Sequence, residues 1–276
     1  MIPQSPLLQN KHFARPAVFQ PENLLRETRR QKSLPAGDVP KVCILDPDGD
    51  IVGHLLKSHQ AERDRVWACY HTSLYRFERA GYSLGIIGCA VGGPFAVLLA
   101  EQLFVSGCEL LLSVTSAGQI APVRTPPYFV LIQKALRDEG TSHHYLPPTK
   151  YVSLLPEVDG PLLTALSQFT PAVERGAAWT TDAPYRETEE AIKFARTEGV
   201  LAVEMEAASL YAFAQARRKP VVCFAHITNR MGVSEGDFEK GEADGTVSSL
   251  RLIEVVAQSW CRRASQPFIH NPTPTV

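Results

Sequence analysis

The sequence lacks any apolar run that approaches the ~20 residues of a membrane-spanning helix, and it lacks blocks of like charge. Its 28 lysine and arginine residues are balanced by 29 aspartate and glutamate residues, which leaves a formal net charge of −1. Proteins that bind nucleic acid or an anionic membrane surface usually carry a basic patch or an excess of positive charge. The sequence therefore predicts neither a nucleic acid nor a membrane as a partner.

Cysteine is also scarce, and the six cysteines include no C-x-x-C pair and no zinc-ligand pattern. The first residues, Met1–Pro6, lack the charged start and apolar run of a secretory signal. Because disulfides are typical of oxidising compartments, we expect reduced and mostly buried thiols, no metal site and a cytoplasmic location.

The remaining composition is that of an ordinary folded domain. Hydrophobic residues make up 45% of the 276 residues and charged residues 21%. This length suits one α/β domain with a single sizeable core. We expect an N-terminal extension over residues 1–40, which is rich in proline, glutamine, arginine and asparagine, a folded domain over 41–265 and a tail over 266–276.

Short apolar runs alternate with segments of helical periodicity along the domain. Strands are expected over residues 41–45, 82–88, 109–114, 128–133, 176–180 and 220–227, and helices over 51–59, 95–104, 161–168, 187–196, 204–217 and 247–263. Such alternation predicts parallel strands with helices on both faces. Ligands of such sheets bind beyond the carboxyl ends of the strands, so the loops after Ile87, Val114 and Ile227 are the expected places for chemistry.

Two of these loops contain small residues or hydroxyl groups. The loop from Gly88 through Gly92 to Pro94 connects a strand to a helix, where backbone N–H groups are able to hold an anion. It matches neither the dinucleotide-binding nor the Walker A pattern, so a structural turn is an equal alternative. Thr115 and Ser116 offer hydroxyl groups at the next strand end, with the same alternative.

The segment Glu204-Met205-Glu206 places two carboxylates at the expected start of a helix, directly before small and apolar residues. One interpretation is that both glutamates stabilise the positive end of the helix dipole. The other, which we favour, is that at least one carboxylate faces a pocket, because side chains two positions apart point in different directions.

Together these segments resemble the purine/uridine phosphorylase family of the nucleoside phosphorylase superfamily, which includes nucleosidases. The resemblance spans about residues 41–262 and is closest to uridine phosphorylase-like members. Its most specific part is Val203–Ala208, and the segments Gly88–Pro94, Ser113–Gly118, Asp138–Ser142 and Thr180–Glu187 follow the family order.

The resemblance implies a single α/β domain whose mixed central sheet is distorted toward a barrel and flanked by helices. It also implies a homo-oligomer (dimer, trimer or hexamer) that cleaves the bond between the ribose C1′ and the base of a purine or pyrimidine nucleoside. No cofactor is implied, apart from inorganic phosphate as co-substrate of a phosphorylase. Glu206 matches the residue that holds the ribose hydroxyls, with Met205 packed against the sugar and Glu204 beside it.

On the base side, the resemblance points to Thr228, Asn229 and Arg230, with Arg186 and Asp182 as weaker candidates. Many purine-cleaving relatives carry an aspartate where this chain has Asn229. We therefore expect an amide that hydrogen-bonds the leaving base instead of a carboxylic acid that protonates it; the alternative is a polar turn residue.

On the phosphate side, the chain departs from the family pattern, because Gly49 and Ser113 stand where the family usually has arginines. The remaining candidates for holding phosphate are Gly88, Gly92, Thr115, Ser116 and a basic group such as His71 or Arg76. From the sequence, phosphorolysis is slightly favoured over hydrolysis as the expected reaction. A nucleoside-binding protein without turnover is a third possibility.

Overall fold

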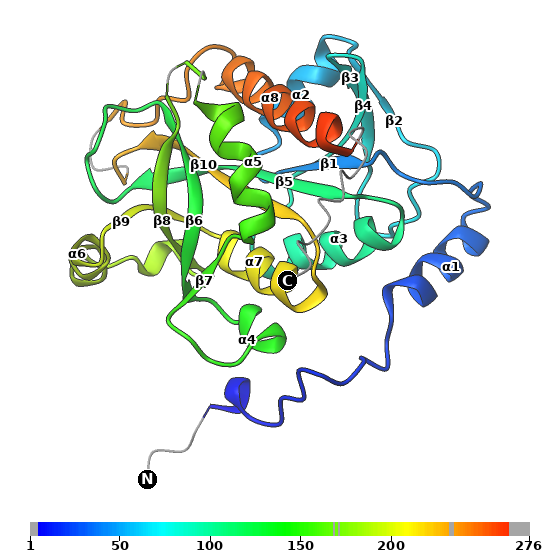
Figure 1. The fold of residues 1–276 in the computed structure, drawn as a ribbon, viewed down its shortest axis with the longest axis horizontal. Coiled ribbons are helices and arrows are strands. Elements are labelled where there is room, and N and C mark those ends of the chain that lie inside the picture. The colour runs from blue at the N-terminus through cyan, green and yellow to red at the C-terminus, as the bar shows by residue number, and fades with distance from the viewer. Residues whose placement is uncertain (1–4, 168, 171, 232–234, 265–276) are drawn as a thin grey trace, which may run out of the picture.

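The computed structural model describes residues 5–167, 169–170, 172–231 and 235–264 and shows a central sheet flanked by helices (Figure 1). The strands are β1 (Val42–Asp46), β2 (Ala61–Arg63), β3 (Tyr75–Arg79), β4 (Tyr82–Gly88), β5 (Leu110–Gln119), β6 (Tyr128–Asp138), β7 (Tyr151–Ser153), β8 (Glu174–Thr181), β9 (Val200–Glu204) and β10 (Val221–Asn229). The α-helices are α1 (Pro21–Gln31), α2 (Asp50–Lys57), α3 (Gly93–Val105), α4 (Ser142–Tyr145), α5 (Pro156–Leu166), α6 (Glu189–Thr197), α7 (Ala207–Arg217) and α8 (Thr246–Ala264). Two short 3₁₀ helices are η1 (Pro6–Leu8) and η2 (Pro184–Arg186).

Five strands of the sheet close into a ring. Hydrogen-bonded pairs run from β5 to β10, β6, β8 and β9 and back to β5. The β10–β6 and β5–β9 pairs are antiparallel, and the other three pairs of the ring are parallel. Strands β1, β4, β3 and β2 extend the sheet outward from β5. The mixed, barrel-like sheet implied by the family resemblance is confirmed, whereas the parallel pairing predicted from alternation holds for only part of it.

The two central strands are buried along their length. Every residue of β10 is buried, and only one residue of β5 is partly exposed. The near-continuous apolar runs of both segments follow from this position, because strands covered on both faces lose the alternation of polar and apolar residues. These runs made both strands predictable from sequence.

Helices cover the sheet on both sides. In Figure 1, α2 and α8 lie on one side of β1 and β5, and α3 and α7 lie on the other. The first eight residues of α7 are all buried, between α3, α4 and the strands of the ring. A helix buried on all sides requires small and apolar side chains, which explains the alanine-rich sequence of α7.

The structure corrects the sequence prediction around the two glutamates. The helix expected over 204–217 begins at Ala207, and Glu204 is the last residue of β9, a strand that the sequence did not predict. Glu206 precedes α7 and has a non-helical backbone conformation. The two carboxylates therefore belong to a strand end and a turn, and not to the first helical turn.

The N-terminal extension contains a helix that packs on the domain. Leu25 and Thr28 of α1 are buried, and the side chains of Arg29 and Lys32 donate hydrogen bonds to the carbonyls of Val66 and Cys69. Farther toward the N-terminus, η1 contacts α4. The expected tail over 266–276 lies outside the described residues.

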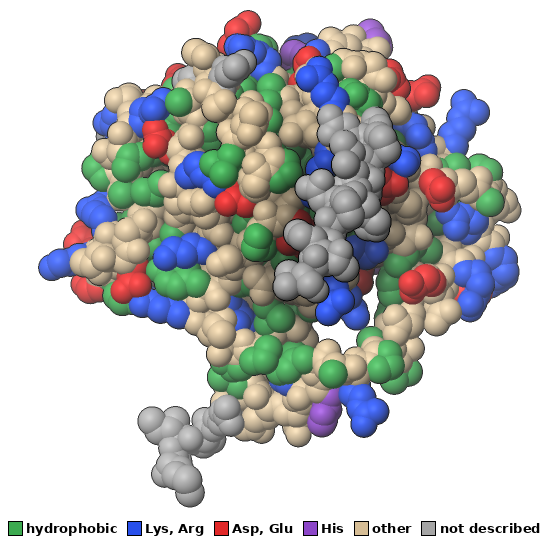
Figure 2. All heavy atoms as spheres, in the orientation of Figure 1, with side chains coloured by type: hydrophobic (Ala, Val, Ile, Leu, Met, Phe, Trp, Pro, Cys, Tyr) green, Lys and Arg blue, Asp and Glu red, His purple; other side chains and the backbone are tan. Residues whose placement is uncertain are grey.

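The surface agrees with the balanced composition. On the face drawn in Figure 2, basic and acidic side chains are interspersed and neither sign gathers in one large patch. Among the described residues, none of the helices combines the length and the apolar character required to cross a membrane. Cys43, Cys69, Cys108 and Cys223 are buried free thiols, whereas Cys89 is exposed.

Gly53→Ala is expected to raise the free energy of unfolding by roughly 0.5–1 kcal/mol. Gly53 lies inside α2, and an added Cβ would have no neighbour within 4 Å. Its backbone also avoids positive φ, so alanine costs no strain there and reduces the freedom of the unfolded chain. Urea denaturation of the variant and the wild type measures the difference, and a lower midpoint would contradict this reading.

Candidate active site

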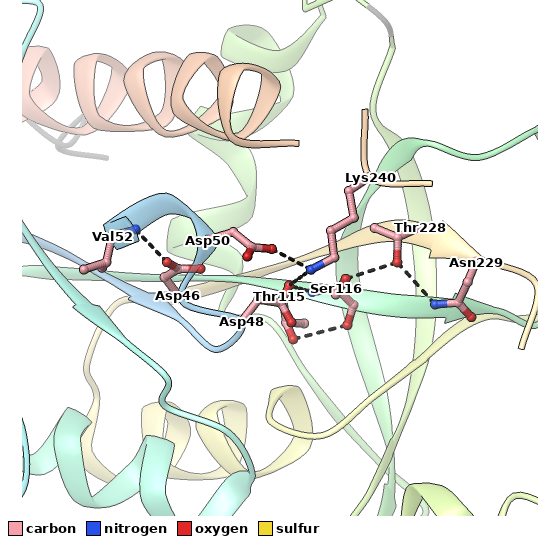
Figure 3. Close-up of polar contacts among 9 residues, drawn as sticks. All are labelled: Asp46, Asp48, Asp50, Val52, Thr115, Ser116, Thr228, Asn229 and Lys240. Carbon is pink, nitrogen blue, oxygen red and sulfur yellow. Dashed lines mark hydrogen bonds and ion pairs between the residues drawn. The ribbon is translucent and has the colours of Figure 1, made fainter. Parts of the chain in front are cut away.

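Three strand ends meet beside the ring. The carboxyl ends of β1, β5 and β10 are adjacent, since β5 pairs in parallel with both other strands. Thr115 and Ser116 of β5 lie opposite Ala225 and His226 of β10, and Gly118 lies opposite Asn229. Figure 3 shows that side chains from all three strand ends converge here. The sequence predicted chemistry at the ends of β5 and β10, but it named the loop after Ile87 of β4 and not the end of β1.

Glu206 is the most deeply placed acid of this region. The residue is 1% exposed, its Oε1 accepts a hydrogen bond of 2.7 Å from the backbone N of Gly92, and the Thr115 side chain interacts with its carboxylate. Its Oε2 is buried and has no hydrogen-bond partner among the described residues. A buried polar atom without a partner is costly, so this oxygen is an unsatisfied acceptor in the core of the site.

Glu204 has a different task. Its Oε2 accepts hydrogen bonds of 2.7 Å from the backbone N of both Glu206 and Ala207, and its Oε1 accepts one of 2.5 Å from the Thr180 hydroxyl. Glu204 therefore caps the start of α7, whereas the Glu206 side chain makes no capping bond. With both oxygens occupied, Glu204 positions Glu206, and the structure does not leave it free for the sugar contact expected from the sequence.

The glycine-rich loop supplies the N–H group that binds Glu206. Gly92 has a φ of +86°, a left-handed conformation that favours glycine. The next residue, Gly93, approaches α7 so closely that an added Cβ would lie 2.8 Å from the Ser209 Cβ and overlap the Ser209 hydroxyl. That hydroxyl donates a hydrogen bond of 2.5 Å to the buried Glu139. Gly88, by contrast, packs its backbone against Val52 of α2.

Hydroxyl and amide groups cluster at the ends of β5 and β10. The Ser116 and Thr228 hydroxyls lie 3.1 Å apart, and the Asn229 side chain donates a hydrogen bond of 3.2 Å to the Thr228 hydroxyl. The Asn229 side-chain oxygen accepts a hydrogen bond from the backbone N of Met231, which fixes the amide orientation. The structure thus brings Thr115, Ser116, Thr228 and Asn229 together with the strand ends, as expected.

The other predicted residues lie farther out. Met205 is partly buried, next to Glu206 in the chain, and Arg230 is exposed at the end of β10. Arg186 is exposed in η2, and the exposed Asp182 accepts a hydrogen bond from the backbone N of Gly140. Among the described residues, no hydrogen bond or ion pair joins Arg186 or Asp182 to Glu206 or Asn229.

His71 and Arg76, the predicted basic groups, also lie away from the place where the ends of β1, β5 and β10 meet. His71 is exposed and lines a cavity of about 410 Å³ together with Lys32, Arg63 and Gly88. Arg76 forms an ion pair with Asp64 and donates a hydrogen bond to the Asp38 carbonyl. It is therefore committed to these partners and does not compensate for the missing arginines.

Sequence reasoning missed two residues of the site, Asp48 and Lys240. Asp48 Oδ2 accepts a hydrogen bond of 3.1 Å from the Ser116 backbone N, and Lys240 Nζ lies 2.5 Å from Asp50 Oδ2 and 3.8 Å from Asp48 Oδ2 (Figure 3). The sequence suggested only a turn for Asp46–Asp50. Three aspartates in five residues were the available signal for a charged site.

Burial raises the pKa of Glu206 to about 8, with a further contribution from the nearby Glu204, whose own pKa burial raises to about 7. An unfolded chain loses these protons near pH 4.5, so the folded protein binds more protons between about pH 5 and 8. Each raised pKa therefore stabilises the fold most at low pH, and this contribution is lost as the pH rises through the folded-state value.

We accordingly expect Glu206→Gln to gain stability relative to the wild type as the pH rises from 5 to 8, because glutamine never ionises. Denaturant unfolding of both proteins at several pH values measures this difference. A difference that stays constant over the range would contradict the raised pKa of Glu206.

Comparison with known proteins places these features in a family. The sequence model of a family described as the phosphorylase superfamily matches residues 41–259. Guanosine phosphorylase of Halorubrum lacusprofundi is 30% identical over 224 residues, which cover 79% of this chain and 87% of that protein. Uridine phosphorylase of Thermococcus kodakarensis is 26% identical over 247 residues, which cover 80% and 84%. An uncharacterized protein of Acanthamoeba polyphaga mimivirus is 29% identical over 150 residues, and the match spans 58% of its length.

Solved structures share the fold at lower identity. Uridine phosphorylase from Vibrio fischeri superposes with a TM-score of 0.67 at 17% identity, covering 82% of this chain and 92% of that one. The 5′-methylthioadenosine/S-adenosyl homocysteine nucleosidase of Campylobacter jejuni gives a TM-score of 0.64 at 16% identity, covering 82% and 100%. At these identities the likeness establishes the architecture alone.

Proposed function

Because the chain belongs to the phosphorylase superfamily, we propose that it is an enzyme that cleaves the N-glycosidic bond of a nucleoside. Two relatives along most of the chain are named for guanosine and for uridine, both of which are nucleosides. A structural neighbour is a nucleosidase of the same fold. The proposal covers purine and pyrimidine nucleosides whose sugar is ribose or a modified ribose.

The observation that carries this proposal is the position of Glu206. Its buried Oε2 has no hydrogen-bond partner among the described residues, while Oε1 is fixed by Gly92. Two vicinal hydroxyls of a sugar would supply the missing donors and favour the charged carboxylate. A carboxylate held there stabilises the positive charge that develops on the sugar as the bond to the base breaks. In this arrangement Met205 is available to pack against the sugar.

We assign the base side to Thr228 and Asn229. The Thr228 hydroxyl lies beside that of Ser116, the Asn229 amide donates to Thr228, and the Asn229 orientation is fixed by the backbone N of Met231. Hydrogen bonds from such groups stabilise the charge that the base receives as it leaves. Arg230, Arg186 and Asp182 remain candidates for contacts with the outer edge of the base.

Incubation of the purified protein with a panel of purine and pyrimidine nucleosides, followed by chromatography of the free bases, tests the proposal. We expect release of base from at least one nucleoside. Thermal stabilisation by nucleosides without any product would instead identify a binding protein that lacks turnover. The homo-oligomer expected from the family resemblance stays a prediction, which light scattering after size-exclusion chromatography would test.

A further inference from the structure

The N-terminal extension contains a run of consecutive exposed residues, 12–19, which we call the arm. Apart from His12 and Arg15, all of its side chains are apolar. Val18 is fully exposed, and Phe19 and Phe13 are 70% and 40% exposed. Single exposed apolar residues are ordinary on a protein surface, but an unbroken group of them marks an interaction site.

The domain holds the arm at its two ends and not along its length. On one side of the arm, α1 contacts α3, and on the other side Lys11 Nζ lies 3.0 Å from His144 Nδ1 of α4. Within the arm, the Arg15 backbone N donates a hydrogen bond to the His12 carbonyl. Among the described residues, no hydrogen bond or ion pair joins residues 12–19 to the domain. The apolar side chains of the arm are therefore available to a partner.

The arm arches over the helices below it. Figure 1 shows the chain running from η1, beside α4, to α1 without following the helices, and Figure 2 shows an opening between this stretch and the rest of the domain. Where the extension reaches α1, a cavity of about 210 Å³ separates Gln20 and Pro21 from Val105 of α3 and Phe213 of α7. The arm thus stands away from its own domain.

The outer face of α3 is a second apolar surface, which we call the α3 stripe. It consists of the exposed residues of α3 and of the loop before it, Val91, Pro94, Leu98 and Val105. The spacing of the three helical residues places them on one side of the helix. The only charged residue of α3, Glu101, accepts hydrogen bonds of 3.0 Å from the side chains of Tyr145 and Arg217. A helix that is apolar all round is normally buried, so the α3 stripe also lacks a cover.

We propose that the arm and the α3 stripe form an interface between two copies of this chain, in which the arm of each copy covers the α3 stripe of the other. An interface with two-fold symmetry uses the same surfaces on both copies. The inference goes beyond the homo-oligomer implied by the resemblance, because the arm lies outside residues 41–259, which match the family.

A second copy is the partner that fits these surfaces. Neither surface presents an acid, and Arg15 is the only arginine or lysine on them, so nothing selects a strongly charged partner. The arm does not cover the α3 stripe of its own chain, since both surfaces are exposed together in one copy. A stable interface buries about 800 Å² per partner, and a covered phenylalanine contributes about 150–250 Å². The arm therefore needs the α3 stripe to reach this area.

The proposed interface borders the candidate active site. Val91 of the α3 stripe directly precedes Gly92, whose backbone N donates the hydrogen bond to Glu206. A copy docked on Val91 would restrain the loop that fixes this carboxylate.

Light scattering after size-exclusion chromatography of the full chain tests the inference. At micromolar concentration the wild type should have at least twice the 30.4 kDa mass of one chain. The double substitution Val18→Ser with Phe19→Ser should raise the dissociation constant about tenfold or more, and so should Leu98→Lys in the α3 stripe. Phe194→Ser changes an exposed phenylalanine of α6 and is the control with an unchanged mass.

Cleavage by chymotrypsin between Phe13 and Ala14, followed by mass spectrometry, is a second measurement. Docking on another copy depends on protein concentration, so cleavage of this bond should slow as the concentration of the wild type rises. In the Leu98→Lys protein the bond should be cleaved rapidly at every concentration. Protection that does not change with concentration would place the arm on its own chain and overturn the inference.

The remaining outcomes are equally distinct. A monomeric wild type overturns the inference, and so does an oligomer whose mass the double substitution in the arm leaves unchanged. Association that only Leu98→Lys weakens would reveal an interface without the arm, which also contradicts the proposal. Because Val18 and Phe19 are exposed, the arm variant retains the fold and keeps the test valid even where Leu98→Lys does not fold. None of these measurements uses a nucleoside, so the inference stands or falls independently of the proposed function.

Discussion

Glu206→Gln should lower kcat/KM for the reactive nucleoside by about 100-fold or more, with the fold retained. Glutamine has the same shape, and its side-chain oxygen still accepts the hydrogen bond from Gly92, which measures 2.7 Å in the wild type. What it loses is the negative charge beside a sugar that becomes cationic in the transition state. The loss should appear mainly in kcat, because the charge matters most after the ground-state complex has formed.

The matched control is Glu190→Gln, which removes one carboxylate from an exposed position in the first turn of α6. Its kinetic constants should equal those of the wild type. Circular dichroism and denaturant unfolding confirm that both variants are folded. A Glu206→Gln enzyme with wild-type kcat would show that this carboxylate does not contact the reacting sugar, and the proposed site would then be wrong.

The expected gain in stability of Glu206→Gln at pH 8 is the counterpart of its loss of activity. Burying an acid with an unpartnered oxygen costs folding free energy, and the wild type bears this cost in the absence of ligand. A sugar diol would offset the cost by donating to that oxygen. Lower activity with higher stability in one variant is the behaviour expected of a functional carboxylate, whereas a purely structural one would lose stability.

The strands that carry the site were predictable from sequence for a physical reason. Strands β5 and β10 are buried on both faces, so each contains an uninterrupted apolar run that stands out in the chain. The closure of the ring was not readable from such runs. It depends on β9, which the sequence did not predict and whose last residue, Glu204, was assigned to the following helix.

The site was predictable only where its residues are close together in the chain. Glu206 stood out because two acids flank Met205 directly before an alanine-rich helix, and the family resemblance then suggested its role. Asp48 and Lys240 meet across a long loop closure, and a single sequence carries no signal for such a pair. The sequence also did not distinguish the role of Glu204 from that of Glu206. The difference arises because β9 ends at Glu204, whose side chain then caps the turn that holds Glu206.

Gly93→Ala is expected to destabilise the fold by about 1–3 kcal/mol and to reduce activity as well. Gly93 does not have a positive φ, so the backbone itself tolerates alanine. The obstacle is α7, because the new Cβ would lie 2.8 Å from the Ser209 Cβ and overlap its hydroxyl. Separation of α3 from α7 would also displace the adjacent Gly92 N–H from Glu206.

Gly53→Ala is the control for this substitution, since it adds the same methyl group to a helix where no atom lies within 4 Å. Urea denaturation should show a loss of stability for Gly93→Ala and a gain for Gly53→Ala. Such opposite signs would show that close packing, and not helix propensity, determines the effect at position 93. Ser209→Gly removes the two atoms that the new Cβ would overlap and leaves only Glu139 Oε2, at 3.6 Å. It also loses the hydrogen bond to Glu139 and costs about 1 kcal/mol of helix propensity. Gly93→Ala should therefore destabilise the Ser209→Gly protein less than it destabilises the wild type. Equal costs in the two backgrounds would show that contact with Ser209 is not what requires glycine at position 93.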